Sequence, residues 1–314
     1  MKQAGVIFTE YQLSLEKGLE VNLIGHSVCN RGWSICNRHL PDMEFIVVYS
    51  GQLLCEIDHI PYLLKEGDGC LIPPGVLISQ YSHNGPCRFF YTHIETGFDV
   101  IEEDKRNELI SKYINAQEEN QEQFFILPPR EEKDNWLFLG SHMDMIEYKD
   151  EIFTLFEKAL LERNQQAPGY LYMLSLYVQQ ILSLASRCFL KKAQTQAKQV
   201  EREQKKLVQD TLSYINAHYA EGINIRLLSA DFFVSQQYLT RVFKAAMGIS
   251  PIKYMNKIRI EQAKKLIRTT NENLSSIAFE VGFDNIYYFS RTFKQYEGIS
   301  PLHYRNWLNS KSNQ

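Results

Sequence analysis

The chain contains one short phrase twice. From Tyr238 it reads YLTRVFKAAMGISPIKYMN, and from Tyr288 it reads YFSRTFKQYEGISPLHYRN. The second copy begins 50 residues after the first, and ten of the 22 aligned positions from 238 to 259 and from 288 to 309 are identical. A repeat of this length indicates one supersecondary unit used twice. It restricts the fold of the last third of the chain more than any other feature.

Each copy has the pattern of an amphipathic helix that ends in a turn. Leu239, Val242, Phe243 and Ala246 follow the i, i+3, i+4, i+7 spacing, which predicts one buried face. Gly248 can terminate this helix in a left-handed conformation. A shorter apolar segment precedes each copy, so both units are typical of a helix-turn-helix. The predicted N-caps are Ser235, Ser250, and either Asp284 or Asn285.

The opposite face of each predicted helix is polar. Its residues are Gln237, Thr240, Arg241 and Lys244 in the first copy and Tyr287, Ser290, Arg291 and Lys294 in the second. Residues 206–314 hold 14 Lys+Arg and 8 Asp+Glu, a net charge of +6, whereas the rest of the chain has a net charge of −9. A basic segment on an acidic body indicates an anionic partner for that segment.

The length of 314 residues predicts two domains, because one core rarely serves so long a chain. No apolar run approaches the length of a membrane span, and the N-terminus has no signal-peptide pattern, so we expect no membrane partner and a cytoplasmic location. The six cysteines show no zinc-binding or CxxC spacing. We expect them to be free buried thiols, with disulfides as the alternative.

The remainder of the chain falls into three stretches. Residues 1 to about 100 have short apolar or alternating runs separated by Gly and Pro, which predict an all-β barrel or sandwich. Residues 143–190 predict two helices broken at Ala167–Gly169. Residues 191–206 are almost wholly polar, which is typical of a linker or a solvated helix end. Everything from there to Trp307 reads as helical.

The segment 206–309 resembles the DNA-binding domain of the AraC family of bacterial transcription regulators. The phrase SSIAFEVGFDNIYYFSRTFKQYEGISPLHYR, Ser275 to Arg305, is similar to the family signature in the second helix-turn-helix. The first unit departs from the pattern at Ser229 and Phe233, where Ala and Gly are usual. The resemblance implies double-stranded DNA as a partner, a homodimer, and contact with RNA polymerase. It also implies base-reading roles for Gln237, Thr240, Arg241, Tyr287, Tyr288 and Arg291, with Lys244 and Lys294 on phosphate.

The N-terminal stretch resembles the cupin motifs in part. GDGCLIPPGVLIS, Gly67 to Ser79, is similar to the second motif, but Ile78 stands at its metal-binding His. The first motif places Asn37, His39 and Glu44 at its other ligand positions, so two of the four metal-ligand types remain. Transition-metal sites usually need three protein ligands with lone pairs. We therefore expect no metal and no cofactor.

A small-ligand pocket inside the barrel is the alternative to a metal site, as in the sugar-sensing members of the AraC family. His39, Glu44 and His93 are its candidate polar groups. Each of the three can equally well serve an ordinary hydrogen bond in the core or at the rim.

A helical seam precedes the polar stretch. Its residues are spaced by three and four, which is typical of a coiled-coil face: Leu171, Leu174, Val178, Ile181 and Ala185. The family commonly dimerises through helices placed in this way. A helix packed on its own barrel would show the same spacing, and both alternatives stay open.

The predicted fold class is an α+β multidomain protein. It has a cupin-like ligand-sensing β-barrel over 1–140, a helical dimerisation segment over 141–192, a linker over 193–206, and an all-α AraC-type DNA-binding domain with two helix-turn-helix units over 207–310. The predicted function is a transcription regulator, favoured as an activator, that responds to a carbohydrate-like ligand. The alternatives are a cupin-type metal enzyme with a helical appendage and a regulator without a small-molecule effector.

Overall fold

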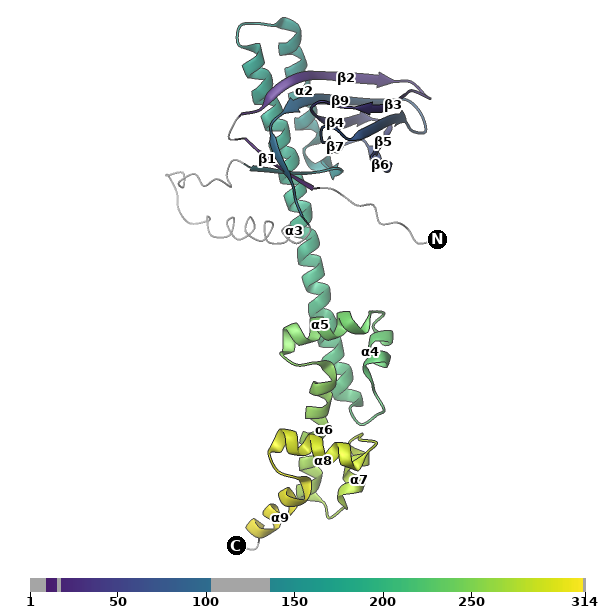
Figure 1. The fold of residues 1–314 in the computed structure, drawn as a ribbon, viewed down its shortest axis with the longest axis vertical. Coiled ribbons are helices and arrows are strands. Elements are labelled where there is room, and N and C mark those ends of the chain that lie inside the picture. The colour runs from purple at the N-terminus through teal and green to yellow at the C-terminus, as the bar shows by residue number, and fades with distance from the viewer. Residues whose placement is uncertain (1–9, 16–17, 103–135, 313–314) are drawn as a thin grey trace, which may run out of the picture. The chain divides into compact units, whose positions relative to one another are not determined.

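The computed structural model describes residues 10–15, 18–102 and 136–312. Parts of the predicted first domain, residues 1–9, 16–17 and 103–135, lie outside these ranges, as do residues 313–314. The chain divides into two compact units, residues 1–196 and 197–314. Strands and helices make up unit 1, and helices make up unit 2 (Figure 1).

The elements of unit 1 are mostly short strands, as the turn spacing predicts. They are β1 (Glu10–Ser14), β2 (Glu20–Cys29), β3 (Ser34–His39), β4 (Met43–Ser50), β5 (Gln52–Ile57), β6 (Ile60–Lys65), β7 (Asp68–Ile72), β8 (Leu77–Ser82), β9 (Cys87–Glu95), β10 (Gly97–Val100), β11 (Trp136–Gly140) and β12 (Met143–Asp144). The helical elements that follow are η2 (Ile146–Tyr148), α2 (Lys149–Gln165) and α3 (Tyr170–His218), so the predicted break at Ala167–Gly169 is confirmed.

The strands form antiparallel sheets. One has five strands in the order β12-β7-β4-β9-β2, one has four in the order β3-β8-β5-β6, and one has three in the order β10-β1-β11. Strand β4 pairs with β7 on one side and with β9 on the other. It therefore lies at the centre of the five-stranded sheet.

Strand β4 is buried on both faces. Ile46 and Val48 belong to an apolar core shared with β5, β6 and β8. The alternate residues Phe45 and Val47 belong to a second core, which includes side chains of α2 and α3 such as Phe156. Because successive side chains of a strand point to opposite faces, this one strand separates the two cores of unit 1.

The helical seam packs on the protein's own domain. Leu174 is 4% exposed, and Val178, Ile181 and Ala185 are fully buried in the core that includes Phe45. Leu171 is the exception, at 60% exposed. Of the two alternatives for this face, the structure shows packing within the chain.

The polar segment 193–206 is helical. It lies inside α3, which has 49 residues, and the division between the two units falls after Gln196. Side chains four residues apart pair along it, with Lys205 Nζ 2.6 Å from Glu201 Oε1 and Gln199 Nε2 2.6 Å from Glu203 Oε1. Such pairs support a helix that has no apolar face. Of the two alternatives for this stretch, a linker or a solvated helix, the structure has the helix.

Unit 2 contains the two predicted helix-turn-helix pairs. Its elements after α3 are α4 (Ile225–Asp231), α5 (Gln236–Met247), α6 (Pro251–Thr269), α7 (Leu274–Glu280), α8 (Ile286–Glu297) and α9 (Pro301–Ser312). Ser235, Ser250 and Asn285 cap α5, α6 and α8 through their side chains, as predicted. Gly248 and Gly298 end α5 and α8 at φ of 74° and 79°. Ala246, expected in the core, is exposed.

Helix α6 runs from the α4–α5 pair to the α7–α8 pair (Figure 1). Its Met255 lies in the core of the first pair with Leu228 and Leu239. Its Ile260, Ala263 and Ile267 lie in the core of the second pair, with partners that include Ile277, Phe289 and Phe293. Each half of α6 therefore completes a different apolar core.

The cysteines are free thiols in the structure, as expected. Cys36 is exposed, and the others are buried: Cys29, Cys55, Cys70, Cys87 and Cys188. No helix among the described residues combines the length and the apolar character that a membrane crossing requires.

Candidate functional site

Helices α5 and α8 each present a polar face to the surface. Their inward residues are buried completely: Leu239 and Phe243 in α5, Phe289 and Phe293 in α8. The predicted recognition residues lie on the other side. Gln237, Arg241, Lys244, Tyr287, Arg291 and Lys294 are exposed, and Thr240 and Ser290 are half-buried.

Tyr288 has a contact within the protein. Its hydroxyl accepts a hydrogen bond of 2.9 Å from Asn256 Nδ2 on α6, and its ring meets that of Phe283 with the centroids 5.8 Å apart. Although 49% of the residue is exposed, these contacts engage its polar atom and one side of its ring. Such a tyrosine is suited to holding α8 on α6 more than to reading a base.

The corresponding tyrosine of the first pair also has an internal role. Tyr238 packs against the cluster of Val208, Val242 and Phe243, and the Arg241 guanidinium carbon lies 5.2 Å from its ring centroid. This cation–π contact reduces the number of directions that the arginine can take. Tyr287, at 81% exposed, is the most exposed aromatic side chain of α8.

Unit 1 has a buried polar cluster, which we call the Glu44 cluster: Arg38, Asp42, Glu44, Gln80 and His93. Glu44 and His93 face each other across β4 and β9 and are 2% and 9% exposed. Arg38 Nη2 donates to both carboxylate oxygens of Glu44, at 3.2 and 3.0 Å, and to Gln80 Oε1 at 3.0 Å. Gln80 Nε2 donates to Glu44 at 3.2 Å.

The charges of this cluster compensate one another. His93 Nδ1 lies 2.8 Å from Asp42 Oδ1, and His93 Nε2 lies 3.6 Å from Glu44 Oε1. The Glu44 carboxylate, with Asp42, raises the pKa of His93 above its ordinary value, although burial opposes this. Partial burial raises the pKa of Asp42, but hydrogen bonds from Asn22 and His93 outweigh it and lower that pKa overall. Paired charges of this kind are tolerated in an interior.

One nitrogen of the Glu44 cluster makes no hydrogen bond to any described residue. The Nε atom of Arg38 is buried, and no hydrogen-bond acceptor among the described residues contacts it. A guanidinium offers five N–H donors, and this one is the buried donor of Arg38 that the cluster leaves unused. The ring of Tyr91 meets that of His93 with the centroids 6.1 Å apart. Phe89 lies next to Tyr91, with a centroid distance of 6.2 Å, and Trp33 lies next to Phe89, with a centroid distance of 5.9 Å.

Of the sequence-predicted ligand residues, the structure brings Glu44 and His93 together and leaves His39 out. His39 is exposed on β3, while its neighbour Arg38 takes the inward position. The cause is a β-bulge between Ile35 and Arg38, where Asn37 adopts a φ of 53°. A bulge shifts the alternation of the strand by one residue. Asn tolerates this conformation, which is the one local signal that the sequence offered.

The structure offers no metal site at the cupin ligand positions. Within the described ranges, no group of three or more His, Cys, Asp or Glu side chains is arranged to hold a metal ion. Ile78, at the position of the motif histidine, is fully buried in the apolar core.

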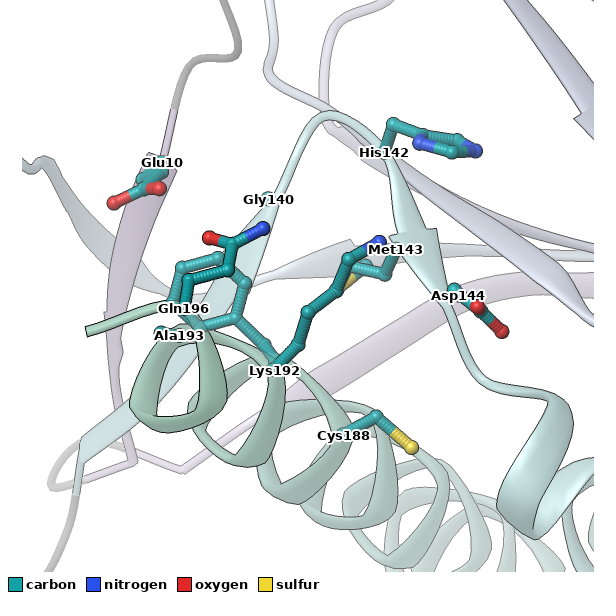
Figure 2. A pocket seen from close by; sticks show the side chains of 10 residues that line it. Glu10, Gly140, His142, Met143, Asp144, Cys188, Lys192, Ala193 and Gln196 are labelled. Atoms are coloured by element: carbon teal, nitrogen blue, oxygen red, sulfur yellow. The ribbon is translucent and has the colours of Figure 1, made fainter. Parts of the chain in front are cut away.

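A separate pocket lies against residues 188–196 in the middle of α3 (Figure 2). It is lined by Glu10, Gly140, His142, Met143, Asp144, Cys188, Phe189, Lys192, Ala193 and Gln196. Its volume of about 140 Å³ is below the range of several hundred Å³ that is usual for small-molecule sites. We assign it no ligand.

Two sequence families match the chain. Residues 228–306 match the family described as helix-turn-helix domain, and residues 20–127 match the AraC-like ligand binding domain. The helix-turn-helix match runs from Leu228 in α4 to Asn306 in α9. The match to the ligand binding domain contains the whole of the Glu44 cluster.

Three relatives illustrate the likeness. The uncharacterized HTH-type transcriptional regulator YisR of Bacillus subtilis is 35% identical over 30% of this chain and 33% of its own length. The HTH-type transcriptional activator RhaS of Klebsiella pneumoniae is 33% identical over 23% of this chain and 26% of its own length. These two matches thus span a third or less of each relative. The uncharacterized HTH-type transcriptional regulator YdeC of B. subtilis is 22% identical over 79% of this chain and 78% of its own length. All three are named as regulators of transcription and none as an enzyme.

The raised pKa of His93 predicts a pH-dependent contribution to stability. Protonated His93 favours the folded state, so its contribution is complete below the unfolded pKa of about 6.5. It is lost as the pH rises through the higher folded pKa. The stability difference between the wild type and His93→Gln should therefore shrink from pH about 5.5 to pH about 9. Urea denaturation followed by tryptophan fluorescence measures it, with exposed His26→Gln as the control. A difference that grows with pH would contradict this assignment.

Proposed function

Because the chain belongs to the AraC family of transcription regulators, we propose that it binds double-stranded DNA sequence-specifically and controls transcription in response to a small molecule. The observation that carries the proposal is the pair of helix-turn-helix units joined by α6, each with a polar outer face over a buried apolar one. Two such units in one chain are suited to a double-stranded partner that presents its groove at regular intervals.

The dimensions of α6 support this proposal. Its 19 residues give a length of about 28 Å at 1.5 Å per residue. Successive major-groove faces on one side of B-DNA lie about 34–36 Å apart. A spacer of this size suits two recognition helices that enter adjacent turns of one duplex.

The exposed side chains of α5 and α8 suggest how bases are read. Arg241 and Arg291 can each donate two hydrogen bonds to guanine, Gln237 is suited to adenine, and the Thr240 methyl to thymine. Lys244 and Lys294 are placed for phosphate contacts, and Ser290 for either kind of acceptor. Tyr287 can contribute an apolar contact. Tyr288 contributes by keeping α8 in place.

We propose that the Glu44 cluster binds the effector, a carbohydrate-like small molecule. Glu44 and Gln80 can accept or donate hydrogen bonds to hydroxyl groups, and the buried Nε of Arg38 is a donor without an acceptor among the described residues. The ring of Tyr91, next to His93, can cover an apolar face of a sugar. Buried polar groups beside aromatic surface are typical of small-ligand sites.

Activation is the regulatory direction that we propose, with RNA polymerase as the protein that the bound regulator contacts. The resemblance to the family supports it, as does the likeness of the DNA-binding segment to the activator RhaS.

We also propose a homodimer, held by a different surface from the predicted seam. Leu161 near the end of α2 and Leu171 and Tyr172 at the start of α3 are 56%, 60% and 71% exposed. These elements are joined by the turn at Ala167–Gly169, so the three exposed apolar side chains lie near one end of the helix pair, and we call them the exposed patch. A dimer would tether two DNA-binding units, which raises their effective concentration on a double site.

The effector proposal predicts ligand-dependent stabilisation. A neutral sugar at 100 times its dissociation constant should stabilise unit 1 by about 2.7 kcal/mol, measured as a rise in melting temperature across a panel of monosaccharides. Arg38→Met should abolish the rise, while His39→Ala should preserve it because His39 faces outward. If no sugar raises the melting temperature, or if the rise survives in Arg38→Met, the site is wrongly assigned.

The DNA proposal predicts separable mutant effects. Arg291→Ala should cost about 1–3 kcal/mol of binding and relax base preference in one segment of the site, and Arg241→Ala should do so in another segment. Lys294→Ala should weaken binding to all sequences and reduce the salt slope by about 1. Tyr288→Phe should leave base preference unchanged. Randomised-site selection tests these outcomes, and relaxation of the same bases by both arginine variants would argue against a tandem reader.

The dimer proposal distinguishes the exposed patch from the buried seam. Leu161→Glu with Leu171→Glu should yield a folded monomer in sedimentation, with weaker binding to a double site. Ile181→Ala should instead lower the free energy of unfolding by about 2–5 kcal/mol, because it opens a cavity in the core. A double variant that still sediments as a dimer would place the interface elsewhere.

A further inference from the structure

Arg259 is a buried arginine in the middle of α6. It is 6% exposed, although arginine is almost never buried without partners. Its Nε donates a hydrogen bond of 2.6 Å to the carbonyl of Tyr219, and its Nη2 donates one of 2.7 Å to the carbonyl of Glu221. Both carbonyls belong to the turn between α3 and α4, which leads into the first helix-turn-helix.

The same guanidinium also contacts the second helix-turn-helix. Its central carbon lies 5.5 Å from the ring centroid of Phe283, which is 1% exposed in the core of that unit. Burial lowers the pKa of Arg259, and the carboxylate of Asp284 raises it. One side chain therefore joins the turn that precedes α4 to the turn between α7 and α8.

The two turns also touch each other directly. Gly282 has a φ of +93°, and a Cβ atom built on it would lie 2.8 Å from the carbonyl oxygen of Ala220 and 2.9 Å from its Cα. Ala220 stands between the two residues whose carbonyls bind Arg259. A glycine is thus required at position 282 both for its conformation and for this close approach.

Two further contacts follow at one-turn intervals along α6. Asn256 Nδ2 donates to the hydroxyl of Tyr288, and the hydroxyl of Tyr296 donates to the carbonyl of Lys253 at 2.9 Å. Residues 253, 256 and 259 are three apart and lie on one face of a helix. This face of α6 holds both ends of α8.

From these contacts we propose that Arg259 is a positioning residue that sets the spacing and rotation between the recognition helices α5 and α8, and hence the base-pair spacing that the protein accepts. The inference rests on the proposed binding of DNA. Apolar cores alone permit small rotations of one recognition helix relative to the other. Two hydrogen bonds from a planar guanidinium instead fix the relative orientation of the parts that they join. Lysine has a single ammonium group and cannot reproduce that geometry.

The test uses the full chain and the duplex that emerges from randomised-site selection with the wild type. Derivatives of this duplex carry one or two extra base pairs between the segments read by α5 and α8. One extra base pair rotates the second segment by about a tenth of a turn. We expect the wild type to bind each derivative at least about tenfold more weakly, because one unit then loses its base contacts.

Arg259→Met should reduce this penalty to within about threefold while base preference in each segment is retained. Arg259→Lys should give an intermediate penalty, since it restores the charge and at most part of the bonding. Arg268→Met is the matched control on the same helix. Arg268 is exposed, so its replacement should leave the spacing profile of the wild type unchanged.

A glycine pair provides a second route that does not remove a charge. Gly282→Ala should disturb the contact with Ala220 and so alter the preferred spacing. Gly298→Ala, at a similar φ of +79° but with no atom within 4 Å of the new methyl group, should lower stability alone. Circular dichroism establishes that each variant is folded.

The outcomes separate this inference from the proposed function. A wild type that selects no duplex would overturn the proposed DNA binding itself. The positioning role would be overturned if Arg259→Met and Gly282→Ala kept the same sharp spacing preference as the wild type. Uniform weakening of all duplexes by both variants, with an unchanged spacing profile, would show a structural role only and would also overturn it.

Discussion

The structure of unit 2 depends on one helix that completes two apolar cores. Met255 belongs to the first core, and Ile260, Ala263 and Ile267 belong to the second. Neither helix-turn-helix pair can bury its apolar side chains without α6, so the two pairs form together. The hydrogen bonds of Asn256 and Arg259 then fix how these pairs are oriented on α6. Two helix-turn-helix pairs are attached to one helix because each half of α6 closes a different apolar core.

Much of unit 2 could be predicted because its signals are local. The caps at Ser235, Ser250 and Asn285 and the terminating Gly248 act within a turn of the residues they affect. The long-range contact of Tyr288 with Asn256 could not be predicted in the same way. Periodicity shows which face is inward or outward, but it does not show which exposed residue is held by another helix.

Unit 1 shows where sequence patterns reach their limit. A seam spaced by three and four predicts a buried helix face, yet it does not identify the partner, and Ile181 turned out to face its own domain. The motif alignment placed His39 inward, whereas a bulge at Asn37 exchanges it with Arg38. Arg38, Asp42 and Gln80 could not be predicted, because a polar cluster assembled from β3, the β3–β4 turn, β4, β8 and β9 has no sequence spacing to detect.

Strand β4 stands between the Glu44 cluster and the helices of unit 1. Glu44 lies on the same side of the strand as Ile46, and Phe45 and Val47 on the other side pack with α2 and α3. The proposed effector site and helices α2 and α3 are thus a single strand apart. A ligand that pulls on Glu44 strains a backbone whose reverse side is already close-packed, and close-packed interiors transmit strain because they compress so little. In the proposed function, a load on this strand would fall first on the side chains that pack against α2 and α3.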